Sequence, residues 1–218
     1  SNEAKAIGIA MGEPYFKCQK LAESHGVNVY SANFVLYGDM SRRVMNTLAQ
    51  FTPEMEIYSI DEAFLSLAGL TQDPYDYIKQ IREQVKRDTG MPVSIGVAST
   101  KTLAKLANKI AKKHSIEGVF CLDESNTDKW LEKLEVGEVW GIGHEKAEFL
   151  KRQGIENVLQ LKNCTDEWVK KHLTIMTLKT VHELRGISCL PLEEVLPDKK
   201  AIGTSRTFGY EVTSLDEV

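Results

Sequence analysis

The sequence feature that most constrains the fold is a pair of adjacent carboxylates, Asp61 and Glu62, inside an otherwise apolar segment that spans residues 55–67. The segment is rich in Ile, Tyr, Phe and Leu, which is typical of a strand. Successive side chains of one strand point to opposite faces, so neighbouring acids cannot share a ligand unless the backbone turns between them. We therefore predict a strand that ends near Ile60, a tight turn at the two acids, and a second strand that starts near Ala63.

The same two carboxylates predict a nearby cation. Carboxylates held this close repel each other, and one pKa rises unless a positive charge offsets the repulsion. A hard divalent ion such as Mg²⁺ prefers oxygen ligands and bridges carboxylates to substrate phosphates. An exposed acidic hairpin turn without a ligand is the alternative, and it is the commoner reading of an isolated Asp-Glu dipeptide.

Strand and helix patterns alternate on both sides of the acidic turn. Strand patterns cover residues 27–30, 55–67, 93–98 and 118–122. A first helix pattern covers residues 3–11, and a second is capped by Asp39 and ended by Pro53. Two more cover residues 75–89, closed by Gly90, and residues 101–113, capped by Ser99 or Thr100. The alternation predicts an α+β fold in which helices pack on a mixed or antiparallel sheet as an α/β sandwich.

The pattern changes after residue 123. Short helices are predicted over residues 130–134, 145–152, 158–161 and 166–185, which indicates a small all-α domain. Residues 187–199 contain two prolines and several charges and are predicted to be a linker. A further strand begins within residues 199–210.

The helix predicted over residues 101–113 carries a stripe of lysines, and a strand of alternating large and small residues precedes it. Residues 93–98 alternate branched apolar residues with very small ones, and we expect the small-residue face to be a substrate-facing floor. On the helix, lysines recur every fourth residue as a basic stripe, with one more beside it: Lys101, Lys105, Lys109 and Lys113, with Lys112. Such a stripe is usually a solvated face, and phosphate binding by at least one of these lysines is the alternative.

A glycine pair marks a second candidate site. Gly141, Ile142 and Gly143 precede a helical pattern that ends before Gly154, which is typical of a helix-hairpin-helix. Backbone N–H groups at such a turn and at the next helix N-terminus bind a nucleic-acid phosphate without reading sequence. A structural turn between packed helices is the alternative. Further contacts are predicted from four neighbouring side chains: His144, Lys146, Lys151 and Arg152.

Composition limits the remaining classes of function. The net charge of −4 argues against nucleic-acid binding through the whole surface, so any phosphate binding must be local. No segment has the length of a membrane span or the pattern of a signal peptide, so we expect a cytoplasmic protein that does not contact a membrane. The cysteines have no metal-site spacing and are predicted to be small buried apolar residues: Cys18, Cys121, Cys164 and Cys189.

Taken in order, five segments resemble Y-family translesion DNA polymerases, and the UmuC branch is the nearest match. These segments are residues 1–5, 37–41, 59–64, 94–107 and 141–143. The resemblance implies a partial fingers domain (1–30), a palm without its first strand (31–122), a thumb with a helix-hairpin-helix (123–186), a linker (187–199) and the start of a truncated little finger (200–218).

The resemblance also assigns roles to residues. It implies that Asp61 is a catalytic, direct metal ligand and that Glu62 is the adjoining carboxylate of a two-metal Mg²⁺ site. Lys112 and Lys5 match positions that contact the nucleotide triphosphate, and Gly141 and Gly143, with His144 and Lys146, match the DNA-binding hairpin. Family members begin with a strand that carries another metal-binding Asp and the residue that rejects ribonucleotides, and this chain is expected to start after that strand.

The activity implied is template-directed DNA synthesis across damaged bases in the SOS response. We expect such synthesis from the intact protein, and little or none, with weak or no Mg²⁺ binding, from this chain. The implied partners are primer–template DNA and a deoxynucleoside triphosphate, with a processivity clamp, a UmuD-type subunit and RecA as further candidates.

Two other classes of function stay open at this point. A non-catalytic module that binds damaged DNA could rely on the glycine turn and the lysine stripe alone. A palm-like nucleotide cyclase also places carboxylates at a hairpin turn, but it has no need of the segment from Gly141 to Leu150.

Overall fold

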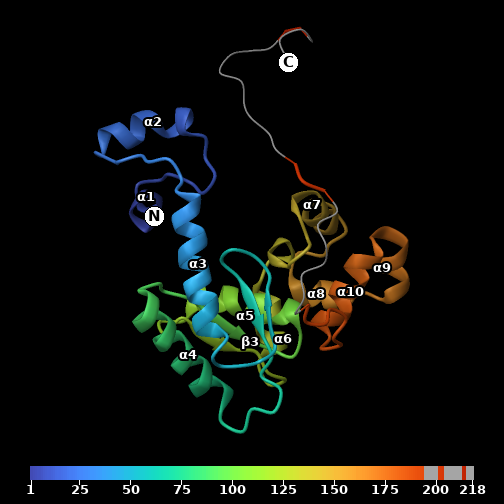
Figure 1. The fold of residues 1–218 in the computed structure, drawn as a ribbon. Coiled ribbons are helices and arrows are strands. Elements are labelled where there is room, and N and C mark those ends of the chain that lie inside the picture. Colours follow the sequence, from blue (N-terminus) through green and yellow to red (C-terminus); the bar gives the residue numbers. More distant parts are fainter. Residues whose placement is uncertain (194–200, 204–212, 215–218) are drawn as a thin grey trace. The chain divides into compact units, whose positions relative to one another are not determined.

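The computed structural model of the 218-residue chain describes residues 1–193, 201–203 and 213–214 (Figure 1). The chain divides into two compact units, Ser1–Met40 and Ser41–Val218. The expected start of the little finger and most of the expected linker lie outside the described residues.

The first unit contains α1 (Asn2–Ala6), α2 (Tyr15–Ser24) and the beginning of α3 (Phe34–Leu48). The helix expected over residues 3–11 ends early because Gly8 adopts a φ of 94°, which lets Ile9 N donate to Ala4 O at 3.0 Å. Gly26 ends α2 in the same way, with a φ of 63°. The strand expected over residues 27–30 is absent there, since that segment is irregular.

The start of α3 also differs from the prediction. The helix begins at Phe34, and Asn33 caps it by accepting a hydrogen bond from Leu36 N at 3.0 Å. Asp39, the predicted cap, therefore lies inside the helix.

In the second unit, the predicted hairpin is confirmed. Strands β1 (Met55–Ile57) and β2 (Ala63–Leu65) pair antiparallel, with Met55 opposite Leu65 and Ile57 opposite Ala63. Strands β3 (Ile95–Val97) and β4 (Val119–Cys121) form a parallel pair. Within the described residues the strands thus form two separate pairs instead of one continuous sheet.

The two long helices of this unit occur as predicted. Helix α4 (Pro74–Thr89) is capped by Asp73, which accepts from Tyr75 N at 2.9 Å, and is closed by Gly90. Helix α5 (Lys101–His114) is capped by Thr100, whose Oγ1 accepts from Leu103 N at 3.3 Å. Buried residues of α3 and α4 form a small core beside the strands, made of Met45, Leu48, Ile81 and Val85.

Between residues 127 and 184 the unit contains only helical elements: α6 (Thr127–Lys133), the 3₁₀ turn η1 (Val136–Glu138), α7 (His144–Arg152), α8 (Val158–Lys162), α9 (Asp166–His172) and α10 (Ile175–Leu184). The single helix expected over residues 166–185 is in fact two helices. Leu173 is extended, and Thr174 starts α10 by accepting a hydrogen bond from Thr177 N at 3.3 Å.

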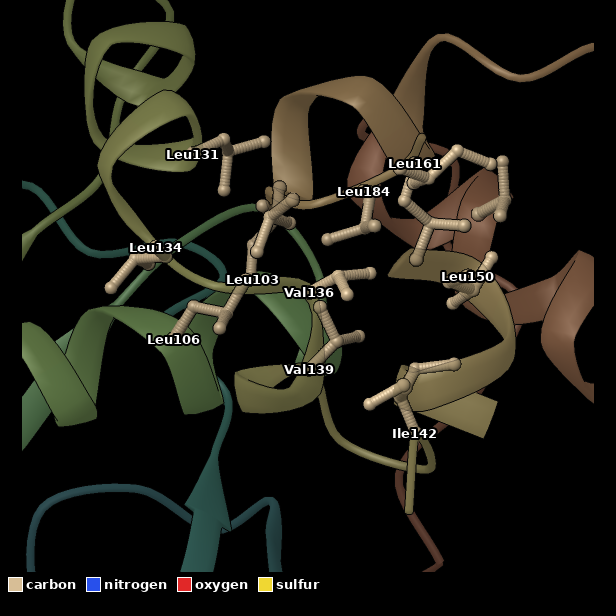
Figure 2. Packing of buried hydrophobic residues seen from close by; sticks show 14 of the residues in the cluster. Leu103, Leu106, Leu131, Leu134, Val136, Val139, Ile142, Leu150, Leu161 and Leu184 are labelled. Atoms are coloured by element: carbon tan, nitrogen blue, oxygen red, sulfur yellow. The ribbon is translucent and has the colours of Figure 1, made fainter. Parts of the chain in front are cut away.

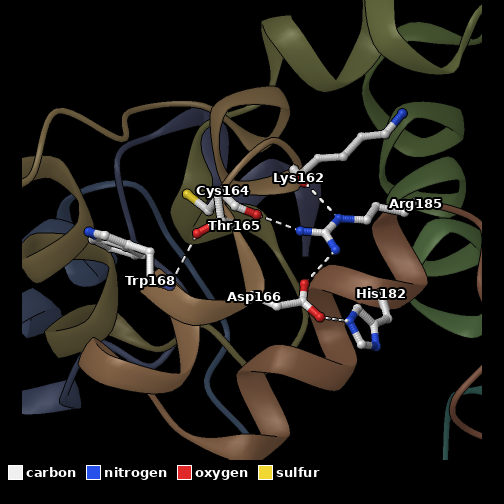
Figure 3. Close-up of polar contacts among 7 residues, drawn as sticks. All are labelled: Lys162, Cys164, Thr165, Asp166, Trp168, His182 and Arg185. Carbon is white, nitrogen blue, oxygen red and sulfur yellow. Dashed lines mark hydrogen bonds and ion pairs between the residues drawn. The ribbon is translucent and has the colours of Figure 1, made fainter.

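A hydrogen-bonded clamp joins α9 and α10 (Figure 3). Asp166, in the first turn of α9, accepts from Arg185 Nη1 at 2.6 Å and lies 2.8 Å from His182 Nε2. Arg185 also donates to the carbonyls of Lys162, at 3.0 Å, and Cys164, so it fastens the end of α8 as well. The hydrogen bonds from Arg185 and then His182 lower the pKa of Asp166.

Helix α5 and the helical region share one core (Figure 2). The side chains of Leu103 and Leu106 on α5 belong to the same buried cluster as Leu131, Leu150 and Leu184. The helix that carries the lysine stripe therefore shares a core with the helices that follow it, and it also packs on β3. The domain boundary near residue 123 stays a prediction.

Two smaller expectations can be compared with the described residues. None of the helices there has the length and apolar character that crossing a bilayer requires. Cys18 is buried as predicted, whereas Cys121, Cys164 and Cys189 are partly exposed.

Candidate active site

The two carboxylates lie in the turn between β1 and β2, as the sequence predicts. The turn is closed by Tyr58 N and Ser59 N, which both donate to the carbonyl of Glu62 at 3.0 Å. Ser59 Oγ donates to Asp61 Oδ1 at 2.8 Å. Asp61 is exposed and Glu62 is partly buried, so both acids can be reached from solvent.

A cation does offset the paired negative charges, and it is a lysine of the chain. Lys105 Nζ, on α5, donates to Glu62 Oε1 at 2.6 Å. The sequence predicts a basic stripe on this helix but gives no sign of which lysine faces the turn. Lys105 and Glu62 are 43 residues apart in the sequence, so no local sequence pattern can predict their contact.

The donor set suits Mg²⁺, which takes one or two protein carboxylates and completes its coordination with water and substrate phosphates. Asp61 and Glu62 supply such carboxylates at an accessible turn. No cluster of three or more His, Cys, Asp or Glu side chains that could hold a metal occurs in the described part of the chain.

Two aromatic side chains, Tyr58 and Trp140, lie against Lys105. Trp140 Nε1 donates to the hydroxyl of Tyr58 at 3.1 Å, and the two rings meet edge to face with centroids 5.3 Å apart. Phe64 on β2 lies 6.0 Å from the ring of Trp140. Sequence reasoning missed Trp140, which precedes the glycine turn and connects that turn to the acidic hairpin.

A cavity of about 220 Å³ opens beside the acids. Asp61, Glu62 and Lys105 line it together with apolar side chains of α3, α4 and β3. Strands β2 and β3 both line it, and each has a strand partner on one edge only among the described strands. Asn108 also lines the cavity, and its buried Oδ1 has no hydrogen-bond partner.

The small-residue face of β3 is explained by α5. A Cβ atom built on Gly96 would lie 2.0 Å from Asn108 N and 2.4 Å from Ala107 C, both backbone atoms of that helix. The glycine therefore allows the helix to pack directly on the strand. The expectation that a substrate approaches the backbone at this face was wrong for Gly96.

The lysine stripe is largely neutralised by carboxylates of the same unit. Lys113 Nζ lies 2.7 Å and Lys109 Nζ 3.6 Å from the carboxylate of Glu138. Burial raises the pKa of Glu138, but these two lysines outweigh it and the net shift is downward. The stripe is thus not a purely solvated face, and phosphate binding by at least one of its lysines stays a prediction.

The remaining lysine of the stripe makes a buried ion pair. Lys101 donates to the carboxylate of Glu56 on β1, and both side chains are 10% exposed or less. Lys101 Nζ also donates to the carbonyl of Pro191 at 2.7 Å, and Glu193 N donates to Glu56 Oε2 at 2.7 Å. The segment at residues 191–193 is therefore held against β1 and α5.

The two lysines assigned to the nucleotide lie elsewhere. Lys112 is exposed on α5 and does not line the cavity, although it is seven residues from Lys105 and so lies on the same helix face about two turns away. Lys5 is exposed on α1 in the first unit. Their roles stay predictions.

The glycine turn precedes α7, as predicted. Gly141 has a φ of 84°, and Gly143 is the N-cap residue of α7 without a side-chain cap. His144 is exposed, and Lys146 Nζ donates back to Gly141 O at 3.4 Å and Thr177 Oγ1 at 3.3 Å. The exposed, uncapped helix start supports the phosphate-binding prediction, which stays a prediction.

One buried acid had no sequence signal. Glu183 on α10 is 0% exposed, and its carboxylate accepts from Thr102 N at 2.9 Å, Cys189 N at 2.9 Å and Leu190 N at 3.1 Å. Thr100 Oγ1 donates to its carbonyl at 2.9 Å. These bonds attach the start of α5 to the end of the helical region.

The acidic hairpin, the lysine helix and the glycine turn lie in a chain that comparison with known proteins assigns to the UmuC group of Y-family DNA polymerases. The chain belongs to the impB/mucB/samB family, whose model matches residues 1–109. It is 44% identical to "Protein UmuC" of Salmonella typhimurium, with 100% of this chain and 53% of that protein covered. It is 41% identical to "Protein ImpB" of the same species, with 99% and 52% covered.

Solved structures agree with this assignment. The fold resembles that in the insertion ternary complex of Dbh DNA polymerase, with a TM-score of 0.74, 25% identity, and coverage of 88% of this chain and 56% of that one. DinB from Sulfolobus solfataricus gives a TM-score of 0.72 at 25% identity, with 88% and 57% covered. The chain spans about half the length of the curated relatives it matches.

Proposed function

We propose that a protein containing this chain carries out template-directed DNA synthesis across damaged bases. The observation that carries the proposal is the Asp61–Glu62 turn, which lines a cavity in a chain 44% identical to Protein UmuC. Similarity to DNA polymerase IV 2 of Mesorhizobium japonicum, at 35% identity over 74% of this chain and 38% of that protein, supports the same activity.

In this proposal Asp61 and Glu62 hold Mg²⁺. When bound, Mg²⁺ stabilises the charge on the attacking and leaving oxygens of a phosphoryl transfer. The exposed turn leaves both acids accessible to a nucleotide, and Ser59 orients Asp61 through its 2.8 Å hydrogen bond. Lys112 and Lys5 contact the nucleotide triphosphate, as the family resemblance implies.

The glycine turn binds the DNA backbone. Gly141 and Gly143 have no side chain to block a phosphate, and α7 begins there without a side-chain cap. His144 and Lys146 add positive charge or hydrogen-bond donors at the same place. Such contacts hold duplex DNA without regard to its sequence.

The cavity between β2 and β3 accepts a further strand. Both strands line the cavity, and each lacks a described strand partner on one edge. The buried Oδ1 of Asn108 in the cavity lining has no hydrogen-bond partner and could accept from a backbone N–H of the added strand. The resemblance implies that this strand brings another metal-binding Asp. Synthesis therefore requires a protein longer than the 218 residues, and the chain alone has little or none. The processivity clamp, the UmuD-type subunit and RecA are likewise proposed as partners of the longer protein.

Primer extension tests the proposal. A longer protein that contains this chain is compared with the chain alone, with Mg²⁺, a damaged template and all four deoxynucleotides. We expect extension past the lesion by the longer protein, none by the chain, and loss of extension with Asp61→Ala. Glu124→Ala, which removes an exposed carboxylate outside the cavity, is the matched control and should extend normally.

Two results would contradict the proposal: robust synthesis by the chain alone, or full activity of the longer Asp61→Ala variant. Unchanged DNA binding together with no synthesis by any longer protein would favour the non-catalytic DNA-binding module instead.

A further inference from the structure

The ammonium of Lys105 occupies the place where the proposed function needs a divalent cation. Its Nζ is 2.6 Å from Glu62 Oε1, and the side chains of the pair are 20% and 31% exposed. Partial burial strengthens such a pair relative to one in bulk water. The repulsion expected between the two acids of the turn is therefore relieved by the chain itself.

Two aromatic faces hold the same ammonium. Lys105 Nζ lies 4.9 Å from the ring centroid of Tyr58 and 5.6 Å from that of Trp140. A cation within about 6 Å of an aromatic centroid is attracted by the electron-rich face. The ammonium thus has a second set of contacts that does not depend on the carboxylate.

The position of Lys105 differs from that of the other stripe lysines. Lys101, Lys109 and Lys113 pair with carboxylates of Glu56 or Glu138, which lie outside the cavity lining. Lys105 alone among these four lines the cavity with Asp61 and Glu62.

A divalent ion that binds Glu62 is repelled by the Lys105 ammonium on the same carboxylate. Like charges a few ångströms apart repel strongly in a partly buried site. The flexible four-carbon stem of lysine lets its ammonium move away, and the rings of Tyr58 and Trp140 continue to attract it.

We propose that Lys105 is a displaceable internal counterion that holds Glu62 in place until a divalent cation takes its carboxylate. Lys105 is in this sense a positioning residue, since it acts through Glu62. The inference rests on the proposed cation-binding role of Asp61 and Glu62. It adds that the Lys105 ammonium holds the Glu62 carboxylate in position before the metal binds, and that this contact lowers the affinity of the site for the metal.

The test is a titration of the 218-residue chain with Mn²⁺, followed by the electron paramagnetic resonance signal of the free ion. Lys105→Met keeps an unbranched side chain that is one atom shorter and removes the competing charge. Lys113→Met is the matched control, because it removes the same charge from the same helix at a lysine paired with Glu138. We expect Lys105→Met to bind Mn²⁺ about 10-fold tighter than the wild type, whereas Lys113→Met changes the affinity less than about twofold.

A double variant isolates the contact. In Glu62→Gln the lysine has lost its carboxylate, so adding Lys105→Met should give no further gain in Mn²⁺ affinity beyond that of the control. Lys105→Gln provides a second neutral replacement, and circular dichroism identifies a variant that does not fold.

Three results would overturn the inference: the same affinity for Lys105→Met and Lys113→Met, a gain that persists in the Glu62→Gln background, or no Mn²⁺ binding by any variant. Failure here is separable from failure of the proposed function. If the longer protein extends primers and Asp61→Ala abolishes extension, the polymerase assignment stands even when Lys105→Met leaves metal affinity unchanged.

Discussion

The contact between β3 and α5 allows the sharpest prediction, the effect of Gly96→Ala. The added Cβ would meet three backbone atoms of α5: Asn108 N at 2.0 Å, Ala107 C at 2.4 Å and Ala104 O at 2.7 Å. Backbone atoms of a helix cannot rotate aside as the tip of a side chain can. Strand and helix must therefore move apart by about 1.4 Å, from 2.0 Å to the 3.4 Å of an ordinary contact.

The cost follows from what the movement separates. Helix α5 buries Leu103 and Leu106 in the core that Figure 2 shows, and Ile110 belongs to the same cluster; all three are at 3% exposure or less. A gap of even 0.5–1 Å removes about a quarter to a half of the attraction between packed atoms. We expect the free energy of unfolding to fall by about 3 kcal/mol, at the upper end of the usual range for overpacking.

Urea denaturation followed by far-ultraviolet circular dichroism measures this loss. The matched control is Gly38→Ala in α3, where an added Cβ meets nothing within 4 Å. A glycine replaced by alanine in a helix is stabilising by up to about 1 kcal/mol, so the two identical substitutions should have opposite signs. A loss below about 1 kcal/mol for Gly96→Ala would show that the strand does not pack on α5 as closely as described.

Two further substitutions address the polar contacts. Glu183→Ala leaves three backbone N–H groups without their acceptor, one buried and two partly buried, and should lower the free energy of unfolding by about 4 kcal/mol. Glu183→Gln keeps one acceptor oxygen and should lower it less. Urea denaturation measures both losses, and equal losses would refute the role of the carboxylate. Asp166 has a pKa below its usual value because of Arg185 and then His182. Its stabilising effect is present above the unfolded pKa of about 3.9 and is lost as the pH falls through the folded pKa, so Asp166→Asn should reduce the fall in melting temperature below about pH 4. An unchanged pH dependence would count against the clamp of Figure 3.

Local chemistry explains which elements the sequence could predict. The hairpin follows from two charges in an apolar strand. Helix α4 follows from apolar spacing closed by Gly90, and α5 from apolar spacing with a capping residue before it. Where several residues can cap, the sequence does not choose: Asn33, not Asp39, begins α3. The break at Leu173 also has no proline or glycine to announce it.

The parts of the site that were missed depend on contacts between distant segments. The charges of Asp61 and Glu62 predict a cation, but only the packing of α5 on β3 decides that Lys105 supplies one. Glu183 contacts Thr102 across 81 residues, and Trp140 meets Tyr58 across 82. The small residue Gly96 was interpreted as space for a substrate, because the pattern of one strand cannot show which neighbour fills that space.

The attachment of residues 191–193 to β1 and α5 closes a loop that starts at the end of α10. Pro191 and Glu193 are bound to Lys101 and Glu56, so the chain between Leu184 and Glu193 is held at both ends. Fixing both ends of a loop costs conformational entropy, and this cost grows only slowly with loop length. The Lys101–Glu56 pair therefore holds this loop against the strand that leads into the acidic turn, and breaking the pair would release residues 191–193 without changing either acid of the turn.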